Sequence, residues 1–203
     1  MTSHPIPTSP FVLRGRVVTP DEVFEDGAVV VDGPVIAWVG GADDVPESWR
    51  DELGDPTDDT LLPGLVDIHC HGGGGASFPD ATTPDEVAAG AREHLNHGTT
   101  SLVASLVTAA GDVLVERAAL LADAVEAGVL VGIHSEGPFL SHERRGAQSP
   151  ADLVAGDPVL VRRLAEAARG HLVTMTLAPE VAGVVAPPDD VCAALVGAGV
   201  LPS

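Results

Sequence analysis

From residue 60 onward, short apolar runs alternate with stretches of helical character, and this alternation constrains the fold more than any other feature of the sequence. The apolar runs occupy residues 62–69, 99–108, 129–137 and 173–180. Helix patterns follow each run, at residues 84–97, at 112–127, from 150 and near 188–198. Strands that alternate with helices form parallel sheets, and strands that are apolar on both faces are typical of a sheet buried between helices. We therefore expect an α/β fold.

Local signals predict where several of these helices begin and end. Thr83 is suited to cap a helix that has Pro84 at its first position and acidic residues in its first turn, and Gly98 is suited to end it. The run Pro150-Ala151-Asp152 indicates another helix start. The stretch GAGVL at 197–201 indicates a helix end that enters a fifth strand.

The first 60 residues have a different pattern. Val-rich runs between residues 11 and 39 are interrupted by turn signals at 19–21, 26–27 and 32–34, which predicts short antiparallel strands. Residues 41–60 are acidic and polar, which indicates a connecting loop with one helical turn. We therefore expect a β-rich element over residues 1–60 and a separate α/β region over residues 61–203.

Charge and composition exclude several classes of partner. Thirty acidic and ten basic residues give a formal net charge of -20, which opposes binding to nucleic acid. Cys70 and Cys192 are too few and too far apart for a disulfide framework. Residues 1–5 do not begin a signal peptide, and no apolar run is long enough to span a membrane. We expect a globular, cytoplasmic protein with no nucleic-acid or membrane partner.

Two histidines stand at the end of the first apolar run, LLPGLVDIHCHGGGG. His69 and His71 are one residue apart, so their side chains are expected on the same face of a short buried strand, with Cys70 on the other face. Asp67 is expected on the histidine face, and the four glycines allow backbone to approach a ligand closely. A hydrogen-bonded pair of ordinary histidines is the alternative to a metal-binding pair, and this context favours the metal.

A carboxylate, Glu136, ends the third apolar run. At the tip of an apolar strand it must be paired, protonated or bound to a metal to offset its desolvation. An ion pair with Arg144 or Arg145 is the alternative. We favour a divalent-metal set formed with His69 and His71, because reactive groups gather at the carboxyl ends of parallel strands.

Two further groups lie at strand ends. His134 precedes Glu136 by two residues and is expected to flank it on the same face. Glu180, the last residue of LAPE, is interpreted as an acid at a helix N-terminus.

Three segments resemble the N-acetylglucosamine-6-phosphate deacetylase family of the amidohydrolase superfamily. They are PGLVDIHCHGGGG (63–75), GIHSEGPFLSHERRGAQSP (132–150) and LAPE (177–180), in this order and spacing. The first alone fits many amidohydrolases, whereas H-x-E-G-P-F followed by R-G-A-Q and L-A-P-E narrows the resemblance to the deacetylases. The resemblance implies a partial (β/α)8 TIM-type barrel, preceded by part of the small β-sandwich that flanks the barrel in this superfamily.

The resemblance also implies an activity and a set of site residues. The family hydrolyses the acetamide of N-acetylglucosamine-6-phosphate, an amino-sugar phosphate, with a divalent metal at the barrel mouth. The glutamate of the E-G-P motif is a metal ligand, here Glu136, and the H-x-H pair, His69 and His71, joins it in members that bind a second ion. Substrate contacts fall on Ala147 and Gln148. One or two ions, zinc or iron, are implied as cofactor, and a homodimer is kept as an option for the full-length enzyme.

The loop SHERRGAQSP (141–150) is suited to a polar sugar. Gly146 allows an unusual backbone turn, Gln148 offers both donors and an acceptor, and Arg144 and Arg145 form a basic pair. We expect this loop to border the metal pocket, with a solvated loop as the alternative.

The sequence departs from the family pattern after LAPE. The family supplies two more metal-binding histidines and a catalytic aspartate, and no motif that carries them occurs before Ser203. A closed barrel also needs eight strands and typically about 250 residues. We therefore expect an amino-terminal portion of a longer enzyme, without its catalytic acid/base, and we expect residues 1–203 alone not to deacetylate the sugar phosphate at a useful rate.

Two other functions remain open at this stage. Another amidohydrolase, such as a dihydroorotase, would keep the metal and change the substrate. A non-catalytic half-barrel that acts as a binding module is disfavoured, because an exposed parallel edge strand promotes aggregation.

Overall fold

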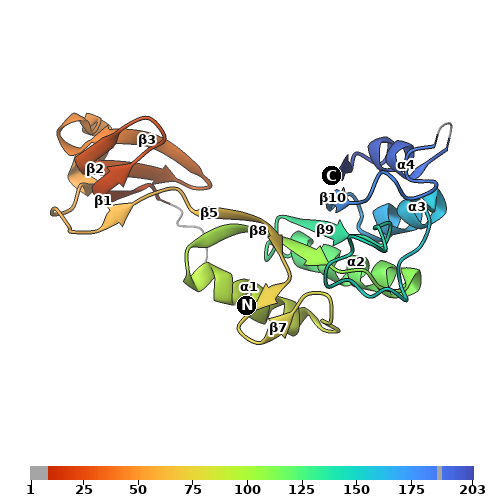
Figure 1. Cartoon of the computed structure of the whole chain (residues 1–203). Coiled ribbons are helices and arrows are strands. Elements are labelled where there is room, and N and C mark those ends of the chain that lie inside the picture. The colour runs from red at the N-terminus through yellow and green to blue at the C-terminus, as the bar shows by residue number, and fades with distance from the viewer. Residues whose placement is uncertain (1–8, 187–188) are drawn as a thin grey trace. The chain divides into compact units, whose positions relative to one another are not determined.

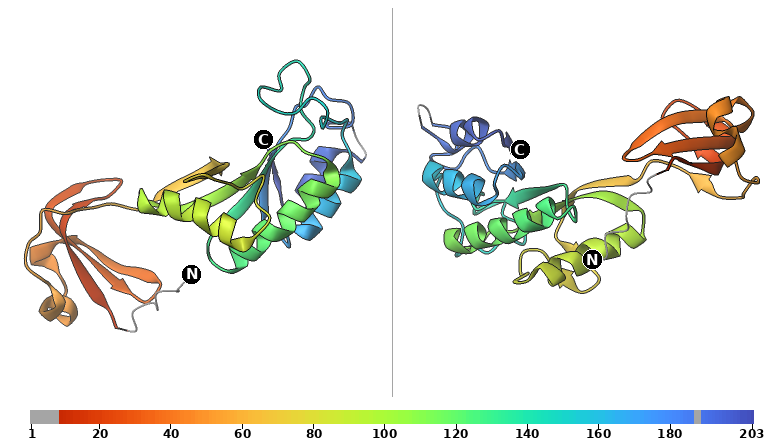
Figure 2. Two further views of the ribbon diagram at one scale, coloured as in Figure 1. Left: turned by 90° about the horizontal axis from the view of Figure 1, so that it is seen from below. Right: turned by 180° about the vertical axis from the view of Figure 1, so that it is seen from behind.

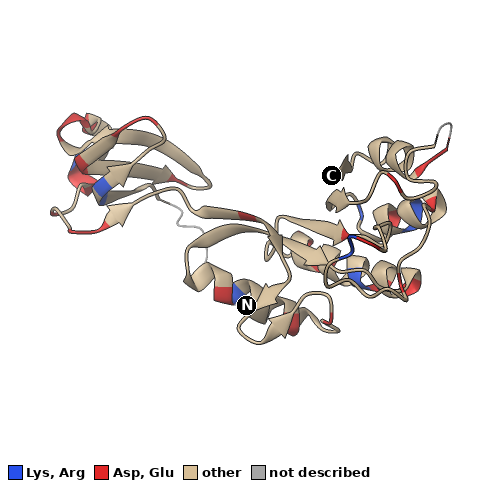
Figure 3. Cartoon of the chain, viewed as in Figure 1, with Lys and Arg blue, Asp and Glu red and all other residues tan. Residues whose placement is uncertain are grey.

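The computed structural model describes residues 9–186 and 189–203, and the chain divides into one unit up to Gly64 and a second from Leu65 to Ser203 (Figure 1). Residues 1–5, considered above for a signal peptide, lie outside the described residues. No helix of the described ranges is long and apolar enough to cross a membrane. Acidic residues are spread over both units, whereas basic residues are few (Figure 3).

The first unit is a four-stranded sheet in the order β3-β2-β1-β4. Its strands are β1 (Phe11–Val18), β2 (Val23–Asp32), β3 (Val35–Gly41) and β4 (Thr60–Leu61). β2 pairs antiparallel with both β1 and β3, while β4 is parallel to β1. Two short 3₁₀ helices, η1 (Ala42–Asp44) and η2 (Glu47–Glu52), occupy the connection to β4. The predicted antiparallel strands and the helical turn in the connection are both present.

The turn predicted at Asp26-Gly27 is wrong, because both residues lie inside β2. A Cβ on Gly27 would lie 2.7 Å from a methyl carbon of Val17, so this glycine allows close packing rather than a turn. Arg14 donates to the Asp26 carboxylate at 2.7 Å and lowers the pKa of that carboxyl group. Tertiary packing and a cross-strand ion pair therefore override the local turn signal.

The second unit contains a five-stranded parallel sheet in the order β11-β10-β9-β8-β5. Its strands are β5 (Leu65–Cys70), β8 (Thr99–Leu106), β9 (Gly132–Glu136), β10 (Leu172–Thr176) and β11 (Leu201–Pro202). Its helices are α1 (Pro84–Asn96), α2 (Gly111–Glu126), α3 (Pro158–Ala167) and α4 (Val191–Gly197). The α/β class, the parallel sheet and the strand expected after residue 200 are confirmed.

The helices pack along one face of this sheet (Figure 2). Between helices and sheet lies a core in which Leu106, Leu121, Ile133 and Met175 are fully buried. The expectation that the sheet is buried between helices is therefore wrong for the described residues.

The expectation of a buried first strand is wrong as well. Val66 and Ile68 of β5 are 67% and 69% exposed, since β5 forms one edge of the sheet. The described residues leave these apolar side chains uncovered.

The first helix of this unit forms where the sequence predicted it. The Thr83 hydroxyl accepts a hydrogen bond from the backbone N–H of Glu86, and the Glu86 carboxylate accepts one from the backbone N–H of Thr83. This reciprocal pair satisfies two backbone donors at the start of α1, with Pro84 at a position that needs no donor.

The helix predicted to begin at Pro150 begins instead at Pro158, capped by Asp157. Residues 150–156 form an irregular segment, in which Val154 donates its N–H to the carbonyl of Pro138. Gly156 packs so closely on Gly183 that a Cβ would lie 2.2 Å from a backbone carbon. These contacts hold the segment in a non-helical path.

The interpretation of Glu180 as an acid at a helix N-terminus is also wrong. Glu180 lies in a turn after β10, while α4 begins at Val191 with Asp190 as its N-cap. The predicted start of that helix, near residue 188, falls outside the described residues.

Candidate functional site

Three side chains meet at the carboxyl ends of β5 and β9, which flank β8. The Nε2 atoms of His69 and His71 are 3.1 Å apart. One carboxylate oxygen of Glu136 lies 3.5 Å from Nε2 of His69 and 3.2 Å from Nε2 of His71. The predicted convergence of these three residues is confirmed, and the alternative ion pair of Glu136 with Arg144 or Arg145 is not formed. We call this group the histidine–glutamate cluster.

The ring of His71 is oriented by the neighbouring strand. Its Nδ1 lies 3.0 Å from the backbone carbonyl of Ser105 in β8. A carbonyl only accepts hydrogen bonds, so Nδ1 carries the proton and Nε2 presents its lone pair to the cluster. This is the arrangement that fixes the tautomer of histidines that bind metals.

Glu136 is held by its backbone. Thr108 donates from its hydroxyl to the carbonyl of Glu136 at 3.1 Å, and Gly137 donates its N–H to the carbonyl of Thr176 at 3.0 Å. Gly137 has a φ of +87°, and a Cβ there would lie 2.2 Å from the Thr108 hydroxyl. Only glycine fits after Glu136, which explains the Glu-Gly step in the sequence.

His134 flanks the cluster without offering it a free nitrogen. Its ring centroid is 4.7 Å from that of His69, while its Nδ1 and Nε2 each lie 2.9 Å from a hydroxyl, of Ser105 and Thr176 respectively. Burial, with the neighbouring His69 and His71, lowers the pKa of His134 to about 4, against a smaller opposing effect of Glu136. At neutral pH the ring is therefore uncharged and acts as a support behind His69.

The supporting hydroxyls of Ser105, Thr108 and Thr176 were not singled out from the sequence. All three lie on strands or directly after them, and each contacts a cluster residue or His134. A hydroxyl residue in or next to an otherwise apolar strand is the sequence signal that could have found them. That signal does not show which side chain the hydroxyl contacts.

Asp67 does not join the histidines, contrary to expectation. Its carboxylate instead lies with Cys70 and His94, on the α1 side of β5. The pairing register of β5 with β8 is irregular between Asp67 and Cys70, so the simple two-residue alternation fails there.

The glycines at 72–75 form a tight hairpin directly after the histidine pair. Gly72–Gly73 (β6) pairs with Ala76–Ser77 (β7), and the two turn residues, Gly74 and Gly75, have φ values of +59° and +84°. Positive φ at both central residues is the requirement of a tight hairpin turn, which accounts for the glycines.

The two predicted substrate residues lie in the loop after β9. Ala147 is exposed, whereas Gln148 is 8% exposed and its side-chain carbonyl accepts from the backbone N–H of Thr108 at 2.8 Å. Arg145 donates to the backbone carbonyl of Gln148 at 2.7 Å, and Gly146 adopts the predicted positive φ, at +60°. Through Thr108, the loop is tied to the strand end that carries Glu136.

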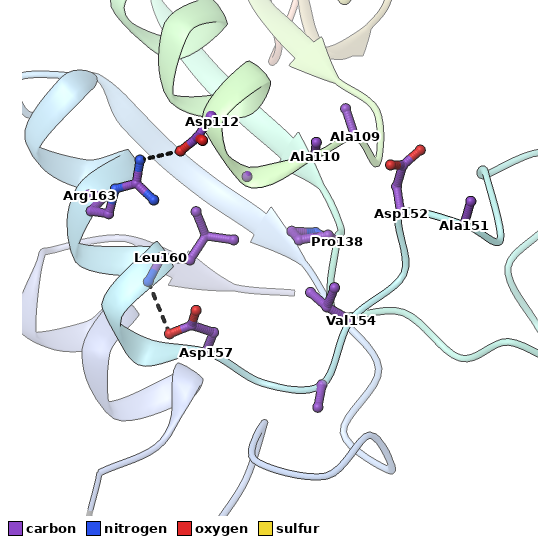
Figure 4. Close-up of a pocket in the computed structure, with 12 residues that line it drawn as sticks. Ala109, Ala110, Asp112, Pro138, Ala151, Asp152, Val154, Asp157, Leu160 and Arg163 are labelled. Atoms are coloured by element: carbon purple, nitrogen blue, oxygen red, sulfur yellow. Dashed lines mark hydrogen bonds and ion pairs between the residues drawn. The ribbon is translucent and has the colours of Figure 1, made fainter.

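A cavity of about 650 Å³ lies beside this loop (Figure 4). Pro138, the segment 151–157 and the starts of α2 and α3 line it, and an ion pair between Asp112 and Arg163 (2.6 Å) closes one side. None of His69, His71 and Glu136 lines this cavity. The cavity is therefore separate from the histidine–glutamate cluster and borders the segment that follows the loop 141–150.

Comparisons with known proteins place this geometry in context. The profile of the Amidohydrolase family matches residues 60–189. The N-acetylglucosamine-6-phosphate deacetylase of Bacillus subtilis is 35% identical over 173 residues, covering 81% of this chain and 43% of the relative. The N-acetylgalactosamine-6-phosphate deacetylase of a Shewanella species is 34% identical over 99 residues, covering 48% of this chain and 25% of the relative.

A solved structure gives the same picture. A variant of N-acetyl-D-glucosamine-6-phosphate deacetylase from Mycobacterium smegmatis, in complex with N-acetyl-D-glucosamine-6-phosphate, superposes with a TM-score of 0.81 and 37% identity. The match covers 96% of this chain and 49% of that one. The chain therefore spans less than half the length of each of these three proteins.

Proposed function

This chain belongs to the amidohydrolase family, and on that premise we propose that it forms the amino-terminal part of a metal-dependent deacetylase acting on N-acetylglucosamine-6-phosphate. The observation that carries the proposal is the convergence of His69, His71 and Glu136 at the carboxyl ends of β5 and β9. The activities named for the relatives from Bacillus subtilis and Mycobacterium smegmatis support the choice of substrate.

The histidine–glutamate cluster fits a divalent ion. Members of the family are metal-dependent, and a zinc ion with bonds of about 2.0–2.1 Å in tetrahedral geometry holds its ligand atoms about 3.3 Å apart. The observed separations are 3.1, 3.2 and 3.5 Å. Two imidazoles and one carboxylate suit zinc or iron, and three protein ligands leave a position open for water. We propose one or two such ions.

The residues of this chain then have distinct roles in the hydrolysis. When bound, a divalent ion supplies a Lewis acid that activates water and polarises the acetamide carbonyl. His71 is held in the binding tautomer by Ser105, and Glu136 is held by Thr108 and by the turn at Gly137. His134 packs beside His69 and stays neutral. Water adds to the carbonyl carbon, the C–N bond breaks, and acetate and a protonated sugar amine are released.

The loop at 141–150 is the proposed sugar-binding segment of this chain. Gln148 and Ala147 lie on it, next to the strand end that carries Glu136. Arg144 is exposed and forms no ion pair with any described residue, so its guanidinium is available for a phosphate group. We assign the phosphate preference to this arginine as part of the proposal.

Architecture, location and assembly complete the proposal. Strands that follow one another across a parallel sheet, with helices on one face, are the arrangement of a (β/α)8 barrel, and we propose that the second unit is part of one. We propose that the first unit contributes to a β-sandwich.

A sugar phosphate is charged and crosses bilayers poorly, so we place the reaction in the cytoplasm. The proposed assembly of the complete enzyme is a homodimer.

A second candidate substrate is N-acetylgalactosamine-6-phosphate, because the Shewanella relative is named for it. Both sugars carry the same acetamide and phosphate groups, so the histidine–glutamate cluster serves either. The difference lies in the contacts to the sugar hydroxyls, and only a direct comparison of the two substrates separates them.

The metal site is tested by zinc binding to residues 1–203, measured by calorimetry together with elemental analysis of the dialysed protein. We expect Glu136→Gln to lose one zinc equivalent, whereas the control Glu180→Gln, which changes an exposed carboxylate in the turn after β10, should bind like the parent chain. Equal zinc binding by Glu136→Gln and the control would refute the metal assignment.

The activity is tested on the complete gene product. We expect acetate release from N-acetylglucosamine-6-phosphate, with lower kcat/KM for the galactosamine isomer, and no measurable turnover by residues 1–203 alone. Turnover of neither sugar phosphate by the complete product would refute the proposed reaction.

A further inference from the structure

A second group of ligand-type side chains lies on the α1 side of β5, opposite the histidine–glutamate cluster. Asp67 and Cys70 of β5 and His94 of α1 each offer one ligand atom, and these atoms all lie within 4.8 Å of one another. We propose that these three residues form a second divalent-cation site, selective for a thiophilic ion such as zinc. We call it the Cys70 site.

The distances in the Cys70 site suit a tetrahedral ion. Sγ of Cys70 lies 3.1 Å from Nε2 of His94, and the carbonyl oxygen of Gly72 lies 3.0 Å from the same nitrogen. Around zinc, with bonds of about 2.3 Å to sulfur and about 2.0 Å to nitrogen, a sulfur and a nitrogen ligand lie about 3.5 Å apart. An outward movement of His94 by a few tenths of an ångström, with release of the proton that Nε2 donates to the Gly72 carbonyl, therefore admits the ion, and the Gly72 carbonyl becomes a fourth ligand.

The chain around the site leaves room for this arrangement. A Cβ on Gly73 would lie 2.8 Å from Nε2 of His94, so the absence of a side chain at Gly73 leaves the imidazole free space beside the hairpin. Cys70 is 6% exposed, and its backbone N–H donates to the hydroxyl of Ser105, which fixes the residue in the strand. The donors are thus positioned by both the hairpin and the sheet.

The chemistry of the donors favours a cation over a simple hydrogen bond. A thiol and an imidazole can pair without a metal, but Asp67 adds a carboxylate oxygen within 4.8 Å of both, and only one of its oxygens is used by the N–H of His69. A thiolate and a carboxylate together carry two negative charges, which a dication neutralises. Sulfur and nitrogen ligands select zinc over magnesium or calcium.

The location of the Cys70 site gives it a consequence for the first site. Cys70 lies between His69 and His71 in the sequence, so one segment at the end of β5 would bind an ion on each of its faces. An ion at the Cys70 site would anchor the end of β5 to α1 and reduce the freedom of the two histidines.

Cobalt(II) provides the test, because only a thiolate ligand gives a strong sulfur-to-cobalt charge-transfer absorption in the near ultraviolet. Residues 1–203 are stripped with a chelator and titrated with cobalt(II). We expect the absorption in the parent chain and in Glu136→Gln, which lacks the first site. We expect the same absorption in Cys192→Ser, the matched control for the only other cysteine.

The absorption should disappear in Cys70→Ser and fall in intensity or affinity in His94→Asn, with folding of both variants verified by circular dichroism. If Cys70→Ser does not fold, His94→Asn and Asp67→Asn are used instead. Each removes one of the other two proposed ligands and should lower the intensity or the affinity of the cobalt absorption. No charge-transfer absorption in the parent chain, or an absorption that persists in Cys70→Ser or is lost in Cys192→Ser, would overturn the proposal.

Discussion

Substitution of Gly137 by alanine should destabilise the second unit through two separable effects. The φ of +87° is costly for any residue with a Cβ, by about 1–2 kcal/mol. The new Cβ would also lie 2.2 Å from the Thr108 hydroxyl, which must move and give up its hydrogen bond to the carbonyl of Glu136, at a cost of about 1 kcal/mol. We therefore expect Gly137→Ala to lower the free energy of unfolding by about 2–3 kcal/mol.

A matched control separates these effects. Gly146 has a similar positive φ, +60°, but a Cβ there meets no atom within 4 Å, so Gly146→Ala should cost only the conformational part, about 1–2 kcal/mol. In a Thr108→Ala background the clash is absent, so Gly137→Ala should then lower the free energy of unfolding only by the conformational cost of the positive φ. The double-mutant cycle should return a coupling of about 1 kcal/mol between Gly137 and Thr108.

The assay is urea unfolding followed by circular dichroism in the helical band. The four α-helices of the described residues all lie in the second unit, whereas Trp38 and Trp49 both lie in the first, so tryptophan fluorescence would report on the wrong unit. Equal costs for Gly137→Ala and Gly146→Ala, or a cycle without coupling, would refute the argument that the Glu-Gly step is required by Thr108. Gly137→Ala should also weaken zinc binding by about 10- to 100-fold, because it disturbs the support of Glu136.

Three further predictions concern stability. Thr83→Ala should cost about 1 kcal/mol, since it removes the cap of α1, while Thr83→Ser should cost much less; equal losses in urea unfolding would contradict the capping role. Hydrogen bonds from Thr82 and Thr83 lower the pKa of Glu86, so its contribution is complete above the ordinary carboxyl pKa and is lost as pH falls through the lowered one. Glu86→Gln should therefore flatten the acid loss of stability, and an unchanged acid profile would contradict this role. Ile68→Ser, at a 69% exposed position, should change the stability of residues 1–203 by no more than about 0.5 kcal/mol, whereas Ile133→Ala should cost about 2–5 kcal/mol; a large loss from Ile68→Ser would show that β5 is covered.

Local sequence signals succeeded where one short segment decides the outcome. Thr83-Pro84 predicted the start of α1 because a cap, a first-turn proline and a reciprocal glutamate act within four residues. The alternation of strands and helices predicted a parallel sheet, because crossovers join parallel strands. From that topology alone, His69, His71 and Glu136 were expected to converge, and they do.

Local signals failed where distant contacts decide the path of the chain. The run Pro150-Ala151-Asp152 predicted a helix start, whereas the helix begins at Pro158 with Asp157 as its cap. The contact of Gly156 with Gly183 and the hydrogen bond from Val154 to Pro138 decide between these two positions, and both partners are distant in sequence. Likewise, Asp26-Gly27 carries a turn signal but lies inside β2, where Gly27 pairs with Gly15 of β1 and with Gly41 of β3.

The sequence by itself determined the kinds of ligand and their order along the chain: an H-x-H pair at one strand end and a carboxylate followed by glycine at another. Tertiary structure alone decided that Asp67 turns away from the histidines toward Cys70 and His94, and that hydroxyls of Ser105, Thr108 and Thr176 support the site. The physical reason is the distance along the chain over which each kind of interaction acts. Backbone propensities and side-chain alternation act over a few residues, whereas strand register, bulges and cross-strand hydrogen bonds depend on which distant segments pack together.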